Sequence, residues 1–281
     1  MRKTRYAAVA IAAAAALTLS ACGGDSGSDS GSTEGSGEKI RIGIKFDQPG
    51  VGFKDGNEYT GFDVDVAKYV ANELGYPEDQ IEFISTPSPQ RENMLENDQV
   101  DMILASYSIT DTRKEKIAFA GPYFVAGQDL LIPNDSDISG PDDLDGKTLC
   151  SVGSSTSAQK IKDNYAAGVN LLEQPSYAEC VTAMQGGSID AVTTDDIILA
   201  GLASTDANKG KFKVIGNTFS EERYGVGLPK EAGLVKCEDI NTAITKMVEE
   251  GAWEEAIKKN TEGVDYTFNA ELNPPETDAC A

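Results

Sequence analysis

Asp101-Met-Ile-Leu-Ala-Ser-Tyr-Ser-Ile-Thr-Asp-Thr-Arg113 joins an apolar strand to a polar end. Residues 102–105 form a short apolar run, which is typical of a buried strand. Ser106 and Ser108 follow, and Arg113 ends the stretch. Hydroxyl groups donate or accept hydrogen bonds, and a guanidinium offers a carboxylate two parallel N–H donors. The order therefore suits a site for the carboxylate of a small ligand. The alternative is a Ser/Thr-rich turn that caps a short helix and leaves Arg113 in solvent.

Short strands and amphipathic helices alternate on both sides of this stretch. Upstream, isoleucine at every second position predicts a strand over 40–44, and a helix opens at Gly61-Phe62-Asp63 and stops at Gly75. The other expected strands are 81–84, 147–152, 171–172, 191–196, 212–215 and 224–228, and further helices begin near 88, 153, 177, 197, 239 and 252. An aromatic turn is expected at 121–124 and an extended crossing segment at 129–133. The alternation predicts an α/β fold with a largely parallel sheet.

Polar side chains gather where the predicted strands end. Lys45 follows the first strand, and Arg91 lies in the first turn of the helix after the second strand. Ligands of α/β sheets bind beyond the carboxyl ends of the strands, so we expect both cations to converge with residues 106–113 on one rim. In the second half, the hydroxyl-rich turn 154–157 can bind an anion or simply cap the helix that follows. The two acids that end the strand 191–196 can cap the next helix or bind an ammonium group.

The composition excludes several classes of function. The chain has 281 residues and a formal net charge of −22, which disfavours binding to nucleic acid and to anionic membrane surfaces. It contains no histidine, so it lacks the commonest general base and a usual zinc ligand. It has no Gly-rich phosphate loop with a lysine, and its cysteine spacings are not those of metal sites. We therefore expect a protein that is not an enzyme, with no catalytic residue, no cofactor and no metal ion.

Residues 1–22 resemble a bacterial lipoprotein signal peptide. Three basic residues precede an apolar stretch at 7–19, and Leu19-Ser-Ala-Cys22 has the order of a lipobox. We expect Cys22 to be acylated and to carry the palmitate of a lipid anchor, which would hold the protein at the extracytoplasmic face of the cell membrane. The alternative is an ordinary secretory signal. Residues 23–38 are rich in Gly and Ser and are expected to form a flexible linker.

The other four cysteines can pair in three ways. We favour one disulfide between Cys150 and Cys180 and another between Cys237 and Cys280. An exported protein folds in an oxidising compartment, which favours disulfides over free thiols. The first bond would tie a strand to a helix in the second α/β unit, and the second would fix the C-terminal tail to a helix. Buried free thiols are the alternative.

Nearly the whole chain after the linker resembles the family 3 extracellular solute-binding proteins of amino-acid ABC importers. The residues that carry the resemblance are 61–65, 100–101, 108–110 with Arg113, 122–123, 146–147, 153–156 and 190–192 with Asp195. Within that family the chain is most similar to glutamate-binding lipoproteins, through residues 45–50, residues 90–92 and the pair Cys150 and Cys180. The resemblance implies a type II binding-protein fold with two α/β lobes joined by two crossing hinge segments. Lobe 1 would be 39–127 with 226–281, and lobe 2 would be 128–225.

The resemblance also implies how the site reads the main-chain groups of an amino acid. Arg113 would bind the α-carboxylate, helped by Ser108 and Thr156. Asp195 would take the α-ammonium, as would the main chain near Ser106.

Lys45 and Arg91 stand where the resemblance implies contact with the side-chain carboxylate of an acidic ligand. With Arg113, they would give three cations against Asp195. Glutamate or aspartate nearly balances that charge, whereas a neutral amino acid would leave buried cations unpaired. We expect L-glutamate or L-aspartate as the ligand, ABC permease subunits as partners and a monomer in solution. The alternatives are a binder of glutamine or another polar amino acid, a dehydratase-type enzyme on the same fold, and a sensor module.

Overall fold

The structure, a computed structural model, describes residues 39–165, 167–231 and 233–280. The proposed signal peptide, the proposed lipidation site Cys22 and the expected linker lie outside these ranges. The strands are β1 (Ile40–Ile44), β2 (Asp47–Gln48), β3 (Gly52–Asp55), β4 (Glu58–Thr60), β5 (Ile81–Ser85), β6 (Met102–Ile103), β7 (Ala118–Pro133), β8 (Thr148–Val152), β9 (Asn170–Gln174), β10 (Ala191–Asp195), β11 (Phe212–Val214) and β12 (Glu221–Leu228). The α-helices are α1 (Phe62–Glu73), α2 (Arg91–Glu96), α3 (Asp111–Lys114), α4 (Thr156–Asn164), α5 (Tyr177–Gln185), α6 (Asp196–Ser204), α7 (Cys237–Glu249) and α8 (Ala252–Thr261).

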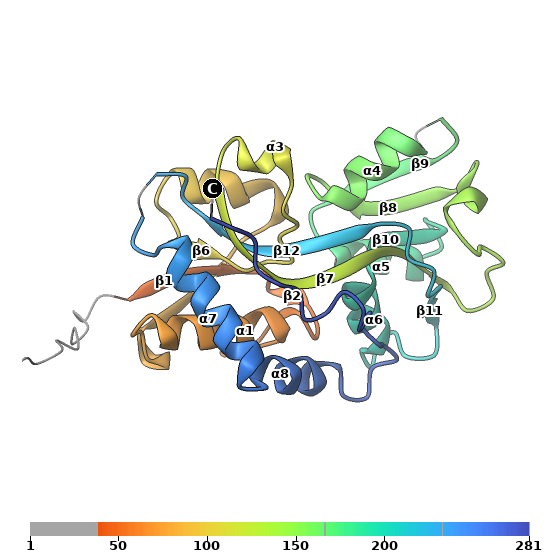
Figure 1. The fold of residues 1–281 in the computed structure, drawn as a ribbon. Helices are drawn as coiled ribbons and strands as arrows, with labels where there is room; N and C mark the ends of the chain where they lie inside the picture. The colour runs from red at the N-terminus through yellow and green to blue at the C-terminus, as the bar shows by residue number, and fades with distance from the viewer. Residues whose placement is uncertain (1–38, 166, 232, 281) are drawn as a thin grey trace, which may run out of the picture. The chain divides into compact units, whose positions relative to one another are not determined.

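Two groups of parallel strands are joined by two longer antiparallel strands. The strand order is β5-β1-β6-β12-β7-β10-β8-β9, and β11 pairs with β7. β1 is parallel to β5 and β6, which belong to the first lobe, and β8 is parallel to β9 and β10, which belong to the second. β7 and β12 lie side by side between the two groups (Figure 1). The α/β fold expected from the sequence is confirmed.

The long strands β7 and β12 pass from one lobe into the other without a loop. β7 pairs with β12 up to Gly127 and with β10 from Gln128 onward. This change of partner coincides with the proposed lobe boundary at 127/128. The boundaries at 127/128 and at 225/226 remain a proposal, because both fall inside continuous strands.

The aromatic turn expected at 121–124 is instead part of β7, and so is the crossing segment at 129–133. Residues 120–132 are buried throughout, and a strand buried on both faces shows a nearly continuous apolar run. The sequence signal from Gly121 and Pro122 marks a local irregularity of the strand. The pairing of β7 with β12 shifts register at this point, between Tyr224 and Val226. Proline is tolerated at such irregularities because no ladder hydrogen bond is lost there.

A tight contact at Gly61 fixes the start of α1. This glycine has a φ of 121°, and a Cβ atom there would lie 2.1 Å from the main-chain oxygen of Val51. Phe62 follows and packs edge-on against Phe124 and Trp253, with centroid distances of 5.3 and 5.7 Å. Because α1 begins here, its first-turn residue Asp63 is held in the interior beside β7.

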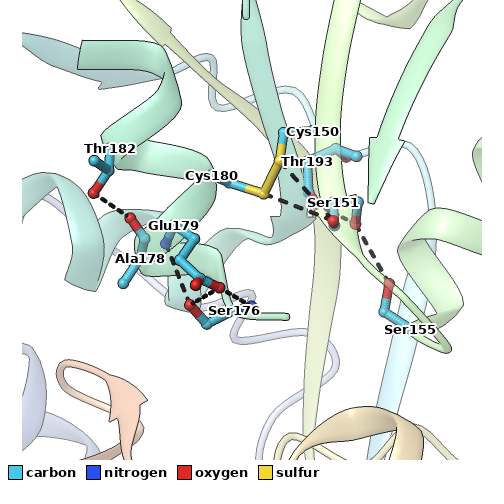
Figure 2. The surroundings of a disulfide bond; sticks show 9 residues. All are labelled: Cys150, Ser151, Ser155, Ser176, Ala178, Glu179, Cys180, Thr182 and Thr193. Carbon is cyan, nitrogen blue, oxygen red and sulfur yellow. Dashed lines mark hydrogen bonds between the residues drawn. A yellow bond between two sulfur atoms is a disulfide. The ribbon is translucent and has the colours of Figure 1, made fainter. Parts of the chain in front are cut away.

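The structure contains both of the disulfides that the sequence favours. Cys150 in β8 is bonded to Cys180 in α5, and their Cα atoms are 5.6 Å apart (Figure 2). Cys237 at the start of α7 is bonded to Cys280 near the C-terminus, with a Cα separation of 5.9 Å. Both separations are typical of disulfides. In the described part of the chain, no helix is long and apolar enough to cross a membrane.

Candidate functional site

A small cavity lies between the residues that follow the two groups of parallel strands. Six of the seven predicted ligand-binding residues line it, and the seventh, Ser108, has its Oγ 3.3 Å from Oγ1 of the lining residue Thr156. The lining consists of Lys45, Gln48, Ser88, Arg91, Ala105, Ser106, Arg113, Ser155, Thr156, Ser157, Tyr177, Thr194, Asp195 and Ile198. The predicted residues from the two halves of the chain therefore meet at one place.

Lys45 and Arg91 are buried cations on the first-lobe side of the cavity. Lys45 follows β1, and its Nζ donates a hydrogen bond of 2.8 Å to Oγ of Ser88. Burial, together with the charge of Arg91, lowers the pKa of Lys45 to about 8. Arg91 begins α2 and is 2% exposed. Its Nη1 donates to the main-chain oxygen of Ala105 at 3.1 Å, while its buried Nε makes no hydrogen bond to the described residues. Arg91 therefore has donors free for a ligand.

Arg113 is buried and contacts both lobes, so the alternative that left it in solvent is wrong. Its Nη1 donates to the main-chain oxygen of Ser108 at 2.7 Å, and its Nη2 donates to that of Ser154 at 3.2 Å. Its Nε lies 3.4 Å from Oε1 of Glu92. A guanidinium has five N–H donors, so these contacts leave one on each terminal nitrogen, which is the pair that a carboxylate binds. Burial and the charge of Arg91 lower the pKa of Arg113 to about 10.

Asp195 ends β10 and is the one carboxylate among the residues that line the cavity. Its Oδ2 accepts a hydrogen bond of 2.5 Å from the hydroxyl of Tyr224. Burial, together with the charge of Glu222, raises the pKa of Asp195 to about 8. Asp196 points elsewhere, because its Oδ1 accepts the main-chain N–H groups of Ile197 and Gly127. Of the two acids, Asp195 is thus the one available to a ligand ammonium group.

Asp63 supports the cavity from behind its lining, a role that the sequence reasoning missed. It is fully buried, and its two oxygens accept hydrogen bonds of 2.7 Å from the Ser106 N–H and from the Tyr123 hydroxyl. Burial raises the pKa of Asp63 to about 6. Gln48 was also missed; its Oε1 accepts from Oγ of Ser106 at 2.5 Å. An acid in the first turn of a helix is common, so only the glycine before Phe62 hinted that this turn is held tightly.

Glu222 is a buried acid near the site. It lies in β12, which begins three residues before the expected strand 224–228, and it is 2% exposed. It forms an ion pair with Lys160 of α4. Successive side chains of a strand point to opposite faces, so Glu221 is exposed and its neighbour is buried. Over the described ranges, no group of three or more Cys, Asp or Glu side chains is placed to hold a metal ion.

Residues 40–262 match the bacterial extracellular solute-binding proteins, family 3. The chain belongs to this family. The glutamate-binding protein GluB of Corynebacterium efficiens is 41% identical over 270 residues, which are 92% of this chain and 90% of that protein. The glutamine-binding protein of Geobacillus stearothermophilus is 40% identical over 196 residues, 69% of this chain and 73% of that protein. Among solved structures, an ancestral arginine-binding protein bound to glutamine has a TM-score of 0.72 at 32% identity and covers 79% of this chain and 96% of its own.

These similarities show the two-lobed type II fold of amino-acid-binding proteins. As a family 3 solute-binding protein, the chain is extracytoplasmic and binds an amino acid as a solute; its relatives are binding proteins and not enzymes.

Proposed function

We propose that this solute-binding protein captures L-glutamate, with L-aspartate as the second candidate, and delivers it to the permease subunits of an ABC importer. It would do so as a monomer anchored to the extracytoplasmic face of the cell membrane through acylated Cys22. The observation that carries the proposal is the charge of the cavity lining: Lys45, Arg91 and Arg113 face Asp195 alone.

The carboxylates behind the lining offset only part of this excess of positive charge. Glu92 pairs with Arg113, and the charge of Asp63 acts on Lys45 and Arg91, but within the described part of the chain no ion pair forms with Lys45 or Arg91. A buried cation without a partner costs several kcal/mol, and a ligand carboxylate would remove that cost. Two carboxylates and one ammonium group would leave the lining close to neutral. This balance favours an acidic amino acid over a neutral or basic one.

Each part of the ligand has a matching group in the cavity. The two free N–H donors of Arg113 would bind the α-carboxylate, with hydroxyls of Ser108 and Thr156 beside them. Asp195 would bind the α-ammonium, as would the main chain near Ser106. Lys45 and Arg91 would bind the side-chain carboxylate. Glutamine is the second candidate class, because the Geobacillus stearothermophilus relative is a glutamine-binding protein.

The test is isothermal titration calorimetry of the full-length protein with glutamate, aspartate, glutamine and arginine. We expect glutamate or aspartate to bind at least about tenfold more tightly than glutamine, and arginine not to bind. Replacing both side-chain cations, Lys45→Met with Arg91→Met, should weaken glutamate about tenfold more than glutamine. The control is Lys162→Met with Lys258→Met, which removes the same charge from exposed positions. Equal losses for both ligands would contradict the acidic-ligand assignment.

A further inference from the structure

Tyr107 lies behind two of the three cavity cations and outside the cavity lining. The Cζ atom of Arg91 lies over its ring at 4.1 Å from the centroid, and the Cζ atom of Arg113 lies over it at 4.9 Å. Phe119 packs edge-on against the same ring, with a centroid distance of 5.0 Å. Tyr107 is fully buried, so both guanidinium groups rest on an aromatic surface that water does not reach.

Two guanidinium groups over one ring repel each other, and the repulsion is strong where water is excluded. The charge of Arg91 contributes to the lowered pKa of Arg113. Arg113 also has Glu92 as a partner. The described contacts of the Arg91 guanidinium are one main-chain oxygen and the ring. The negative face of an aromatic ring attracts cations, so the ring offsets part of the repulsion.

The ring, rather than the hydroxyl group, makes these contacts. The hydroxyl oxygen of Tyr107 forms no hydrogen bond of standard geometry with the described residues. Burial raises the pKa of this hydroxyl well above its ordinary value, so the side chain is neutral near pH 7. The interaction with the guanidinium groups is therefore that of an uncharged π-system, which phenylalanine could also supply.

We propose that Tyr107 is the positioning residue that sets ligand selectivity: its ring holds the guanidinium groups of Arg91 and Arg113 together at the cavity, so that the protein prefers amino acids with a second carboxylate. This inference rests on the proposed function. Arg113 would bind the α-carboxylate of every ligand, whereas Arg91 would meet only the side-chain carboxylate. If the ring face attracted the guanidinium groups less strongly, Arg91 should lose its position at the cavity. The preference for glutamate over glutamine should then fall.

The experiment replaces Tyr107 with phenylalanine and then with mono-, di- and trifluorophenylalanine by nonsense suppression in the full chain. Fluorination withdraws electron density from the ring face and nearly preserves its shape. Tyr107→Phe should bind glutamate within about threefold of the original protein, and stepwise fluorination should lower the glutamate-to-glutamine affinity ratio by up to about tenfold. In an Arg91→Met background, the same series should leave that ratio unchanged. Thermal unfolding checks that each variant is folded.

The matched control is the same fluorinated series at Phe119, which packs on Tyr107 and has no cation over its ring among the described residues. That series should leave the ratio unchanged. If the original protein prefers glutamate but fluorination at position 107 does not alter the preference, the role of Tyr107 is wrong and the proposed function stands. If the original protein does not prefer an acidic amino acid, the proposed function fails and this inference fails with it.

Discussion

The carboxylate of Asp63 holds the main chain of Ser106 in the left-handed region. Oδ2 of Asp63 accepts the Ser106 N–H at 2.7 Å, and Ser106 has a φ of 46°. A residue other than glycine is strained there by about 1 kcal/mol or more. The strain is offset by this hydrogen bond and by the one that Oγ of Ser106 donates to Gln48. One buried acid thus shapes the turn that carries the polar end of the stretch 101–113.

Replacing this acid should weaken binding of all amino acids. In Asp63→Asn, the side chain can accept from Ser106 or from Tyr123, but its NH2 group cannot accept from the other. We expect about tenfold weaker binding of glutamate and glutamine alike, by calorimetry, and a loss of about 1–3 kcal/mol in the free energy of unfolding. Tyr123→Phe is the control, because it removes one hydrogen bond to the acid and leaves Ser106 in place. Unchanged affinity in Asp63→Asn would show that the turn holds without the acid.

The raised pKa of Asp63 also predicts a pH dependence of stability. The folded protein holds this proton more tightly than the unfolded chain, since burial raises the pKa from 3.8 to about 6. The stabilisation that the folded protein gains from binding this proton is complete below pH 3.8 and is lost as pH rises through about 6. As pH rises from 4 to 6, the unfolding free energy of the original protein should therefore fall relative to that of Asp63→Asn. A difference that is constant over this range would contradict the assignment.

The preference for glutamate should fall as pH rises through about 8. Lys45 has a pKa of about 8 and loses its charge above that pH. Of the two ligands, only glutamate has a side-chain carboxylate that this charge would stabilise. The glutamate-to-glutamine affinity ratio isolates this effect, because Asp195 acts on both ligands equally. We expect the ratio to fall about threefold to tenfold between pH 7 and pH 9. Lys45→Arg stays charged and should show no such fall, and Lys45→Met should give a low ratio at every pH.

Arg113 should matter for every ligand. Arg113→Ala leaves a ligand carboxylate without its partner, which costs roughly 2–5 kcal/mol. Calorimetry should find glutamate and glutamine weakened by similar factors. Arg223→Ala serves as the control, since Arg223 is half-exposed and pairs with Asp278 away from the cavity. A change of less than about threefold in Arg113→Ala would mean that another group binds the α-carboxylate.

The two disulfides should differ in their effect on binding. Cys150 adjoins Ser151, whose Oγ donates to the main-chain oxygen of Thr193 at 2.9 Å and lies 3.4 Å from Oγ of Ser155 (Figure 2). Opening the first disulfide, in Cys150→Ser with Cys180→Ser, should cost about 2–4 kcal/mol of stability. It should also weaken glutamate binding, because Tyr177 of α5 lines the cavity and Ser151 of β8 lies beside the lining residue Ser155.

The second disulfide provides the comparison. In Cys237→Ser with Cys280→Ser, the unfolding temperature should fall while glutamate affinity stays within about twofold, since neither α7 nor the C-terminal tail carries a residue of the cavity lining. Equal affinity losses in the two double variants would mean that the first disulfide acts through overall stability alone.

Membrane attachment should depend on Cys22. Cys22→Ala should leave an uncleaved precursor or release the protein into the medium, as fractionation and mass spectrometry of the N-terminus would show. A processed Cys22→Ala chain that stays with the membrane would contradict lipid anchoring.

Local patterns predicted most of the lobes and most of the cavity. Alternating isoleucines identified β1, and the rule that ligands bind at strand ends brought Lys45 and Arg91 to one rim. The sequence could not show that Asp63 is buried beneath the cavity, because an acid in the first turn of a helix gives the same sequence pattern whether it is exposed or buried. Glu222 was missed because β12 begins at residue 221 and was expected only from 224. Contacts between distant segments, such as that of Tyr224 with Asp195, leave no local pattern to read.

The ladder between β7 and β12 has one joint where its register shifts. The shift falls at Gly225, where a Cβ atom would lie 2.9 Å from the main-chain oxygen of Ala120, and such an irregularity bends a strand and interrupts its ladder locally. On one side of that joint, Tyr224 donates to Asp195; at the joint itself, the N–H of Gly225 donates to the main-chain oxygen of Tyr107. The joint is thus hydrogen-bonded to the cavity residue Asp195 on one side and, at Gly225, to the residue that lies behind two cavity cations. We expect ligand binding at Asp195 to bias the bend between the lobes through this joint.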